Sequence, residues 1–436
     1  MTRQTPCGPI AGAPARTPGV TAYKGIRYAT AGRWQYPVPV TRWDGCYRAD
    51  HFGPNAMQQS AFVPEAHNGR DPFYYHEFRE GLPYTYAEDC LFLNIWAPDD
   101  ARNAPVILYL HGGAFLGGSG WDKCFDEPAW TRAGVVAVTV NYRLGPLGYA
   151  CLPELAAEAG HAGNYGLYDQ LCAVQWVHDN IAAFGGDPGN ITLMGQSAGA
   201  RSVQMLCSTT ATAPLVRRAV MSSGGGEPSV LFAGDRRMES QYDFWTAWRE
   251  AAGAASLDEL RALPVRVLFD ALNRCFGAQG FGAVMAHMGP VWDNALFSAG
   301  GPTLVVPYLA GGNSEDMRPE LAADALAWCR RQPVPSYAWY FSHPLPGDDK
   351  GAWHSADLWY WFGTLANGWR PFTEADRALS DAMVGYLINF ARTGDPNGSG
   401  LPAWESARTT GRVLRLDTPA PAMAEPRAGG TSVFGW

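Results

Sequence analysis

Short, mainly apolar runs recur along the chain. They cover Leu91 to Trp96, Val106 to Leu110, Val135 to Val140, Ile191 to Met194, Ala219 to Ser222, Thr303 to Tyr308 and Tyr337 to Phe341. Strands that are covered on both faces of a mostly parallel sheet have this continuous apolar character. The pattern therefore predicts a strand at each run, and it predicts that most of these strands lie in one buried sheet.

Helical periodicity appears between these runs. The clearest case is Leu167 to Phe184, where apolar residues recur every three or four positions until Gly185 and Gly186 end the pattern. A second amphipathic helix is predicted over Leu379 to Ala391, and residues 236–300 are expected to be mainly helical. Strands that alternate with helices are typical of α/β proteins.

The segment GQSAG, Gly195 to Gly199, follows one predicted strand and precedes a helical stretch. A strand, a sharp turn with a serine at its tip, and a helix form a nucleophile elbow. Glycines permit the strained turn, and the N-terminus of the helix favours negative charge beside the serine. Ser197 is therefore the candidate nucleophile. By itself, a pentapeptide of this composition is equally compatible with an ordinary turn.

A second glycine motif, HGGAF at His111 to Phe115, follows the predicted strand that ends at Leu110. Acyl transfer passes through a tetrahedral oxyanion that needs preorganised N–H donors. Gly113 and Ala114 are predicted to provide two donors, and Ala198 a third. An ordinary strand-to-loop turn is the alternative for either motif alone, but the occurrence of both after predicted strands favours catalysis.

Composition narrows the function classes. Of 436 residues, 47% are hydrophobic and 17% are charged, and the net charge is −8. Nucleic acid is therefore an unexpected partner, because phosphate binding needs a basic face. We see no apolar stretch long enough for a membrane span and no secretory signal pattern. The nine cysteines are scattered without metal-ligand spacing, which is expected of reduced thiols in a cytoplasmic protein.

Several further segments, together with these motifs, resemble the type B carboxylesterases, the group that also contains cholinesterases. They are YKGIRYA from Tyr23, EDCLFLNIW from Glu88, NYRLGPLGY from Asn141, GNYGLYDQ from Gly163, FGGDPGNITLMGQSAG from Phe184, SSG from Ser222 and NFARTGDPNG from Asn389. The resemblance implies one α/β-hydrolase domain over residues 1–436. It has a central, mostly parallel twisted sheet flanked by helices, and helical and loop insertions cover the active site.

The resemblance also implies a triad of serine, acid and histidine in that chain order. The segment GAWHSADLWYWFG makes His354 the predicted general base and Asp357 a structural acid, with His343 as the alternative base. In AGGNSEDM, Asp316 stands where the family has its glutamate, and Glu315 precedes it. We therefore expect Asp316 to orient the histidine, with Glu315 as the alternative.

Other positions modify or support this site. Gln196 stands where many relatives have glutamate, which argues against a cationic choline-type substrate. Ala114 replaces a common glycine, and its methyl group narrows the space there. Ser223 resembles the family's serine that supports the histidine–acid pair by hydrogen bonding.

The resemblance also implies parts of the scaffold. Arg143 is expected to pair with Asp169, and Arg33 with Glu88, in ion pairs that hold loops near the site. Cys90 is expected to be reduced, because Met57 stands near the place of its usual disulfide partner.

Aromatic residues crowd the histidine segment, and Phe73 to Tyr75 is expected to form an exposed or lid-like loop. The histidine segment and its surroundings contain Trp353, Trp359, Tyr360, Trp361 and Trp369. Aromatic walls suit neutral esters of short or medium acyl chains or of aromatic acids, although core packing is the favoured explanation for any single ring. No cofactor is expected. An amidase or acyltransferase would use the same triad, and a catalytically inactive binding protein is the remote alternative.

Overall fold

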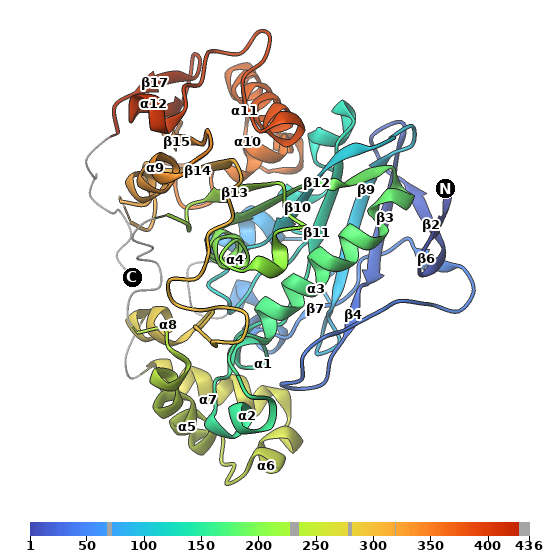
Figure 1. Ribbon diagram of the computed structural model, residues 1–436, viewed down its shortest axis with the longest axis vertical. Helices are drawn as coiled ribbons and strands as arrows, with labels where there is room; N and C mark the ends of the chain where they lie inside the picture. The colour runs from blue at the N-terminus through green and yellow to red at the C-terminus, as the bar shows by residue number, and fades with distance from the viewer. Residues whose placement is uncertain (68–71, 227–234, 278–280, 319, 427–436) are drawn as a thin grey trace.

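The computed structural model describes residues 1–67, 72–226, 235–277, 281–318 and 320–426, and it is built around one 13-stranded sheet (Figure 1). The strand order is β1-β2-β3-β9-β11-β10-β12-β13-β14-β15-β16-β17, and β6 pairs with β2. The strands are β1 (Thr2–Thr5), β2 (Gly8–Pro14), β3 (Val20–Arg27), β6 (Tyr47–Ala49), β9 (Phe92–Pro98), β10 (Ala104–Leu110), β11 (Val136–Val140), β12 (Gly186–Gln196), β13 (Arg218–Ser222), β14 (Tyr308–Asn313), β15 (Tyr337–Phe341), β16 (Val413–Leu416) and β17 (Ala422–Ala424). Two small sheets pair β4 (Ala29–Thr30) with β5 (Val38–Pro39) and β7 (Asn55–Ala56) with β8 (Tyr86–Ala87).

The middle of the large sheet is parallel, as predicted. Each neighbouring pair from β11 through β10 and β12 to β16 runs parallel, whereas β9, β3 and β17 join antiparallel. Parallel strands need crossover connections, and these contain helices.

The α-helices flank this sheet or gather beyond it. They are α1 (Gly145–Tyr149), α2 (Pro153–Ala159), α3 (Tyr165–Asn180), α4 (Ala198–Leu206), α5 (Tyr242–Ala251), α6 (Leu257–Ala262), α7 (Val265–Gly277), α8 (Phe281–His287), α9 (Leu321–Arg331), α10 (Leu358–Phe362), α11 (Glu374–Thr393) and α12 (Ala407–Thr410). A π-helical turn covers Tyr75–Arg79. Short 3-10 turns cover Gln59–Ala61, Glu65–His67, Lys123–Phe125, Ala129–Ala133, Ile181–Phe184, Thr210–Thr212, Met238–Gln241 and Leu365–Asn367.

Alternate residues of the central strands belong to two separate hydrophobic cores, one on each face of the sheet. In β10, Val106, Leu108 and Leu110 lie in a core with residues of α3 and α4, whereas Ile107 and Tyr109 lie in a core with residues of α11. Side chains point alternately to the two faces of a strand, so a strand covered on both faces is apolar at every position. This explains the continuous apolar runs in the sequence.

Most predicted elements are confirmed within a few residues. The strand over Tyr337 to Phe341 matches β15, and the helix predicted from Leu167 matches α3 with the 3-10 turn after it. The strand over Thr303 to Tyr308 is wrong, because β14 begins only at Tyr308. Pro307 lacks an N–H donor at this point, and β14 contains two glycines that resemble a turn.

The parallel arrangement gathers the candidate residues at one edge of the sheet. Ser197 follows β12, Asp316 follows β14, and His354 lies on the segment after β15. The carboxyl ends of parallel strands lie at the same edge, where ligands of open α/β sheets bind. In Figure 1, α4 begins at this edge beside β13. Within the described residues, no helix is both long and apolar enough to cross a membrane.

Candidate active site

Ser197 occupies a strained turn between β12 and α4. Its φ of 56° and ψ of −124° are unusual for a residue with a side chain. Its N–H donates to the Ser222 carbonyl at 2.8 Å, which holds the turn against β13. A Cβ at Gly195 would lie 2.3 Å from the Gly199 carbonyl oxygen, and a Cβ at Gly199 would lie 2.0 Å from that of Leu110. Glycine is therefore required at both ends of the motif.

The HGGAF loop lies against this turn. A Cβ built on Gly112 would lie 2.9 Å from the Cβ of Ser197. Gly113 and Ala114 have positive φ angles of 113° and 53°. Their N–H groups, and that of Ala198 at the start of α4, donate to no acceptor among the described residues. These three N–H groups therefore stay candidate donors to an oxyanion formed at Ser197.

His354 and Asp316 are in direct contact. The Nδ1 atom of His354 lies at hydrogen-bond distance from Oδ1 of Asp316, and both side chains are buried. Asp316 also accepts from the N–H groups of Asn313, at 3.1 Å, and Met317, at 2.9 Å. These bonds orient the carboxylate, and the contact places the ring proton on Nδ1 and the lone pair on Nε2.

The alternative acid and the alternative base lie elsewhere. Glu315 accepts from the N–H of Ala352 at 2.9 Å, so it supports the backbone of the histidine segment rather than the imidazole. His343 contacts Asp376 at 2.9 Å, and Asp376 belongs to α11.

The Gln196 side chain contacts the outer nitrogen of the same histidine. Its Nε2 atom lies 3.2 Å from Nε2 of His354 and donates to Oγ of Ser355 at 2.8 Å. Within the described part of the chain, the Ser197 hydroxyl makes no hydrogen bond. Hydrogen bonds between a nucleophile and its base are often formed only when substrate is bound. Gln196 therefore contacts the imidazole of His354 through a neutral amide rather than a carboxylate.

Ser222, the residue before the predicted supporting serine, contacts the second acid, Asp357. Ser222, at the end of β13, donates to Oδ2 of Asp357 at 2.7 Å. The hydroxyl of Ser223 is buried and has no partner among the described residues. Ser223 has a φ of 51°, so the chain turns immediately after the strand. Ser222 thus supports Asp357, whereas support of the histidine–acid pair by Ser223 stays a prediction.

Asp357 is a buried carboxyl beneath the histidine segment. It also accepts from the indole of Trp361 at 3.2 Å and from the side chain of Asn313 at 3.3 Å. Burial raises its pKa to about 6, and the charge of Asp316 adds to this increase, while the hydrogen bond from Ser222 opposes it. Sequence reasoning missed Asn313, which joins this acid to the carbonyl of Trp353 at 2.7 Å.

The segment from Phe73 to Tyr75 is not an exposed loop. Phe73 and Tyr74 pack edge-on against the buried ring of Trp353, with ring centroids 4.9 and 5.7 Å apart. The Tyr74 hydroxyl donates to the carbonyl of His354 at 3.2 Å. In the π-helical turn that follows, Glu77 binds Arg370 at 2.9 Å with both side chains fully buried. This segment therefore packs directly behind the histidine.

Most of the aromatic residues near His354 are part of the core. Trp353, Trp359, Tyr360 and Trp361 are fully buried, whereas Trp369 is 52% exposed. The alternative explanation of core packing therefore holds for these four residues.

The scaffold contacts implied by the family resemblance are present. Arg143 binds Asp169 through two buried bonds of 2.8 and 2.7 Å, and Arg33 binds Glu88 through bonds of 2.7 and 2.6 Å. Cys90 is buried, and none of the nine cysteines forms a disulfide. Among the described residues, no group of three or more histidine, cysteine or acidic side chains is arranged to hold a metal ion.

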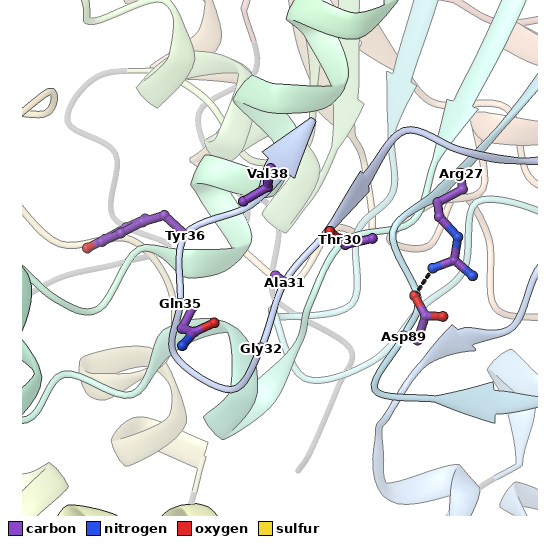
Figure 2. Close-up of a pocket in the computed structure, with 8 residues that line it drawn as sticks. All are labelled: Arg27, Thr30, Ala31, Gly32, Gln35, Tyr36, Val38 and Asp89. Atoms are coloured by element: carbon purple, nitrogen blue, oxygen red, sulfur yellow. Dashed lines mark hydrogen bonds and ion pairs between the residues drawn. The ribbon is translucent and has the colours of Figure 1, made fainter. Parts of the chain in front are cut away.

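A separate surface hollow of about 300 Å³ lies near the N-terminal strands (Figure 2). Figure 2 shows the ion pair between Arg27 and Asp89 at one side, and Gln35 and Tyr36 on the loop opposite. None of the candidate catalytic residues lines this hollow. We therefore do not assign the reaction to it.

Comparison with known proteins relates the chain to esterases and a lipase. The model of the carboxylesterase family matches residues 1–318 and 319–430. The chain is 30% identical to human (Homo sapiens) bile salt-activated lipase over 89% of its own length and 62% of the lipase. It is 30% identical to fumonisin B1 esterase of Sphingopyxis macrogoltabida over 81% of its length and 62% of that esterase. The matches thus span about three fifths of these two longer relatives.

Solved structures give the same relationship for the fold. A PNB esterase superposes with a TM-score of 0.81 at 25% identity, covering 97% of both chains. The carboxylesterase of Geobacillus stearothermophilus superposes with a TM-score of 0.78 at 28% identity, again over 97% of both chains. The sheet order, the turn at Ser197 and the family match all indicate the same fold. The chain has the α/β-hydrolase fold and belongs to the carboxylesterase family.

Proposed function

We propose that the protein is a serine carboxylesterase that hydrolyses small-molecule esters through an acyl-enzyme. The observation that carries this proposal is the contact between Asp316 and His354 at the sheet edge where the strained Ser197 turn lies. Membership of the carboxylesterase family supports the same chemistry. A catalytically inactive binding protein is disfavoured, because the serine, the histidine and the acid of the predicted triad are all present.

In the proposed mechanism, Ser197 Oγ attacks the ester carbonyl while Nε2 of His354 accepts its proton. The carbonyl oxygen becomes an oxyanion, and the N–H groups of Gly113, Ala114 and Ala198 stabilise it. His354 then protonates the leaving alkoxide. Water, activated by the same nitrogen, attacks the acyl-enzyme and releases the acid. Asp316 keeps the Nδ1 proton in place and stabilises the imidazolium, and the scheme needs no cofactor.

For the substrate, we propose neutral esters of short or medium acyl chains or of aromatic acids. The residue before the nucleophile is the neutral Gln196, so no carboxylate at that position attracts a cationic alcohol group. The methyl group of Ala114 restricts the space beside the oxyanion donors. We also propose that residues 1–436 form one domain, because β1 and β17 belong to the same sheet. The nine free thiols support a cytoplasmic location.

The test is hydrolysis of p-nitrophenyl esters from acetate to decanoate by the unaltered protein and by Ser197→Ala. We expect the variant to lose at least about 1,000-fold in kcat. Ser208→Ala, which changes a serine in the turn after α4, is the matched control and should keep its activity. A fluorophosphonate should label Ser197 in the unaltered protein only.

Three outcomes would change the proposal. Equal activity of the unaltered protein and Ser197→Ala would exclude Ser197 as the nucleophile. Faster release from anilides than from matched esters would favour an amidase, and trapping of the acyl group by added alcohol in preference to water would favour an acyltransferase.

A further inference from the structure

Arg201 lies in the first turn of α4, directly after the nucleophile. Its backbone N–H donates to the Ser197 carbonyl at 3.0 Å, so the two residues are one helical turn apart. Side chains four positions apart lie on the same side of a helix, and they lean toward its N-terminus. The Arg201 side chain therefore leaves α4 on the side that carries Ser197, and one of its terminal nitrogens reaches Gln204 on the next turn.

The guanidinium of Arg201 is buried without a counter-ion. The residue is only 8% exposed, yet it makes no ion pair with a carboxylate among the described residues. Its one hydrogen bond runs from a terminal nitrogen to Oε1 of Gln204 at 3.3 Å. The ring of Trp292 lies beside it, with its centroid 5.9 Å from Cζ. A guanidinium has five N–H donors, so most of its donors lack a protein acceptor.

The other buried arginines of the described chain each bind a carboxylate or at least three acceptors, although Nε of Arg218 has no partner. Arg143 and Arg370 bind carboxylates. Arg218 donates to two backbone carbonyls and an asparagine, and Arg236 donates to three backbone carbonyls. Arg201 differs from all four.

Arg201 and Arg236 are two buried arginines that lie close enough for the charge of the first to act on the second. Burial lowers the pKa of Arg201 to about 10, so it remains charged at neutral pH. Burial also lowers the pKa of Arg236 to about 10, and the nearby charge of Arg201 contributes to that decrease. An unpaired ion in the protein interior costs several kcal/mol, which an apolar side chain of similar length would avoid. Such a site is suited to an anion that arrives from outside.

We propose that Arg201 binds a carboxylate carried by an ester substrate, so that the enzyme also accepts anionic esters in addition to the neutral esters proposed above. A guanidinium matches a carboxylate with two parallel hydrogen bonds, which makes arginine the preferred residue for this recognition. This inference rests on the proposed esterase function. Neutral esters remain substrates, because the triad and the oxyanion donors act on the ester carbonyl alone.

The experiment compares matched pairs of esters. Mono-p-nitrophenyl glutarate and p-nitrophenyl butyrate differ by a carboxylate on the acyl side, and 4-acetoxybenzoate and phenyl acetate differ by a carboxylate on the alcohol side. For Arg201→Met, we expect kcat/KM to fall about 10- to 100-fold for one of the anionic esters, mainly through KM. The neutral esters should change less than about threefold. Arg201→Lys should restore part of the loss, because it keeps the charge but not the paired geometry.

Arg217→Met is the control for a general loss of positive charge, since Arg217 is exposed at the start of β13. It should leave both ester pairs unaffected. Whichever anionic ester responds to Arg201→Met identifies the side of the substrate that carries the carboxylate. Equal losses on anionic and neutral esters in both Arg201 variants, with unchanged circular dichroism, would overturn the proposal and make Arg201 a structural residue.

A binding measurement separates this inference from the proposed function. Free glutarate should bind the unaltered protein in a calorimetric titration, and Arg201→Met should weaken that binding at least tenfold. The titration does not depend on catalysis. Absence of ester hydrolysis and of fluorophosphonate labelling would refute the esterase, whereas equal glutarate affinity, or none, in both proteins would refute the carboxylate site.

Discussion

Asp316 and His354 are 38 residues apart in the chain, and the carboxylate of the first contacts ring nitrogen Nδ1 of the second. The contact exists because β14 and β15 are parallel neighbours, so the segments that follow them leave the sheet at the same edge. Glu315 precedes Asp316 and binds the backbone at Ala352 instead. One position in the chain thus separates an orienting acid from a residue that supports the loop.

Asp316→Asn should therefore lower kcat about 10,000-fold, because the amide no longer holds the correct histidine tautomer or stabilises the imidazolium. Glu315→Gln keeps an oxygen for the Ala352 N–H and should stay within about tenfold of the unaltered protein. Steady-state hydrolysis of p-nitrophenyl butyrate measures both. A larger loss in Glu315→Gln than in Asp316→Asn would reverse the assignment.

Gly113→Ala should lower kcat about 100- to 1,000-fold by displacing an oxyanion donor. The added Cβ would lie 2.1 Å from the Gly117 carbonyl oxygen, at a φ of 113°. Gly134→Ala is the matched control, since Gly134 also has a positive φ but open space around its Cβ position. Its kcat for p-nitrophenyl acetate should be unchanged. Full activity of a folded Gly113→Ala protein would exclude the loop from oxyanion binding.

Glu77→Gln should destabilise the protein by about 3 kcal/mol, because it leaves the buried guanidinium of Arg370 with Asp348 as its one carboxylate partner among the described residues. Urea unfolding measures the change. The exposed pair of Glu374 and Arg377 provides the control, and Glu374→Gln should change the stability by less than about 0.5 kcal/mol. Equal stability of the two variants would show that the buried pair contributes no more than the exposed one.

Asp357→Asn should alter how stability depends on pH. Because burial raises the pKa of Asp357 to about 6, the folded protein binds a proton there that the unfolded chain releases near pH 4. The contribution of this proton to the free energy of unfolding is complete below pH 4, and it is lost as the pH rises to about 6. The amide does not titrate, so the variant should gain about 3 kcal/mol relative to the unaltered protein between pH 4 and pH 7.

Urea unfolding at several pH values tests this prediction. Asp258→Asn is the control, because that carboxylate is almost fully exposed and should show no such trend. A stability difference that stays constant, or that falls with increasing pH, would contradict the assignment of a neutral buried acid at Asp357.

The sequence by itself determined the local features of this protein. Apolar runs covered on both faces predicted the central strands, and the glycines around Ser197 predicted the elbow, because both depend on backbone conformation and on neighbours a few residues away. The family motifs indicated His354 and the acidic pair after β14. The catalytic roles of these residues remain predictions that the proposed variants test.

Tertiary structure decided everything that depends on which side chains meet. It brought Asp316 rather than Glu315 to the imidazole, and it placed Ser222 rather than Ser223 on Asp357. It also left Arg201 buried without a counter-ion among the described residues. A difference of one residue reverses the direction of a side chain at the end of a strand, and the charges around a buried group come from distant segments. Neither can be obtained from the order of residues alone.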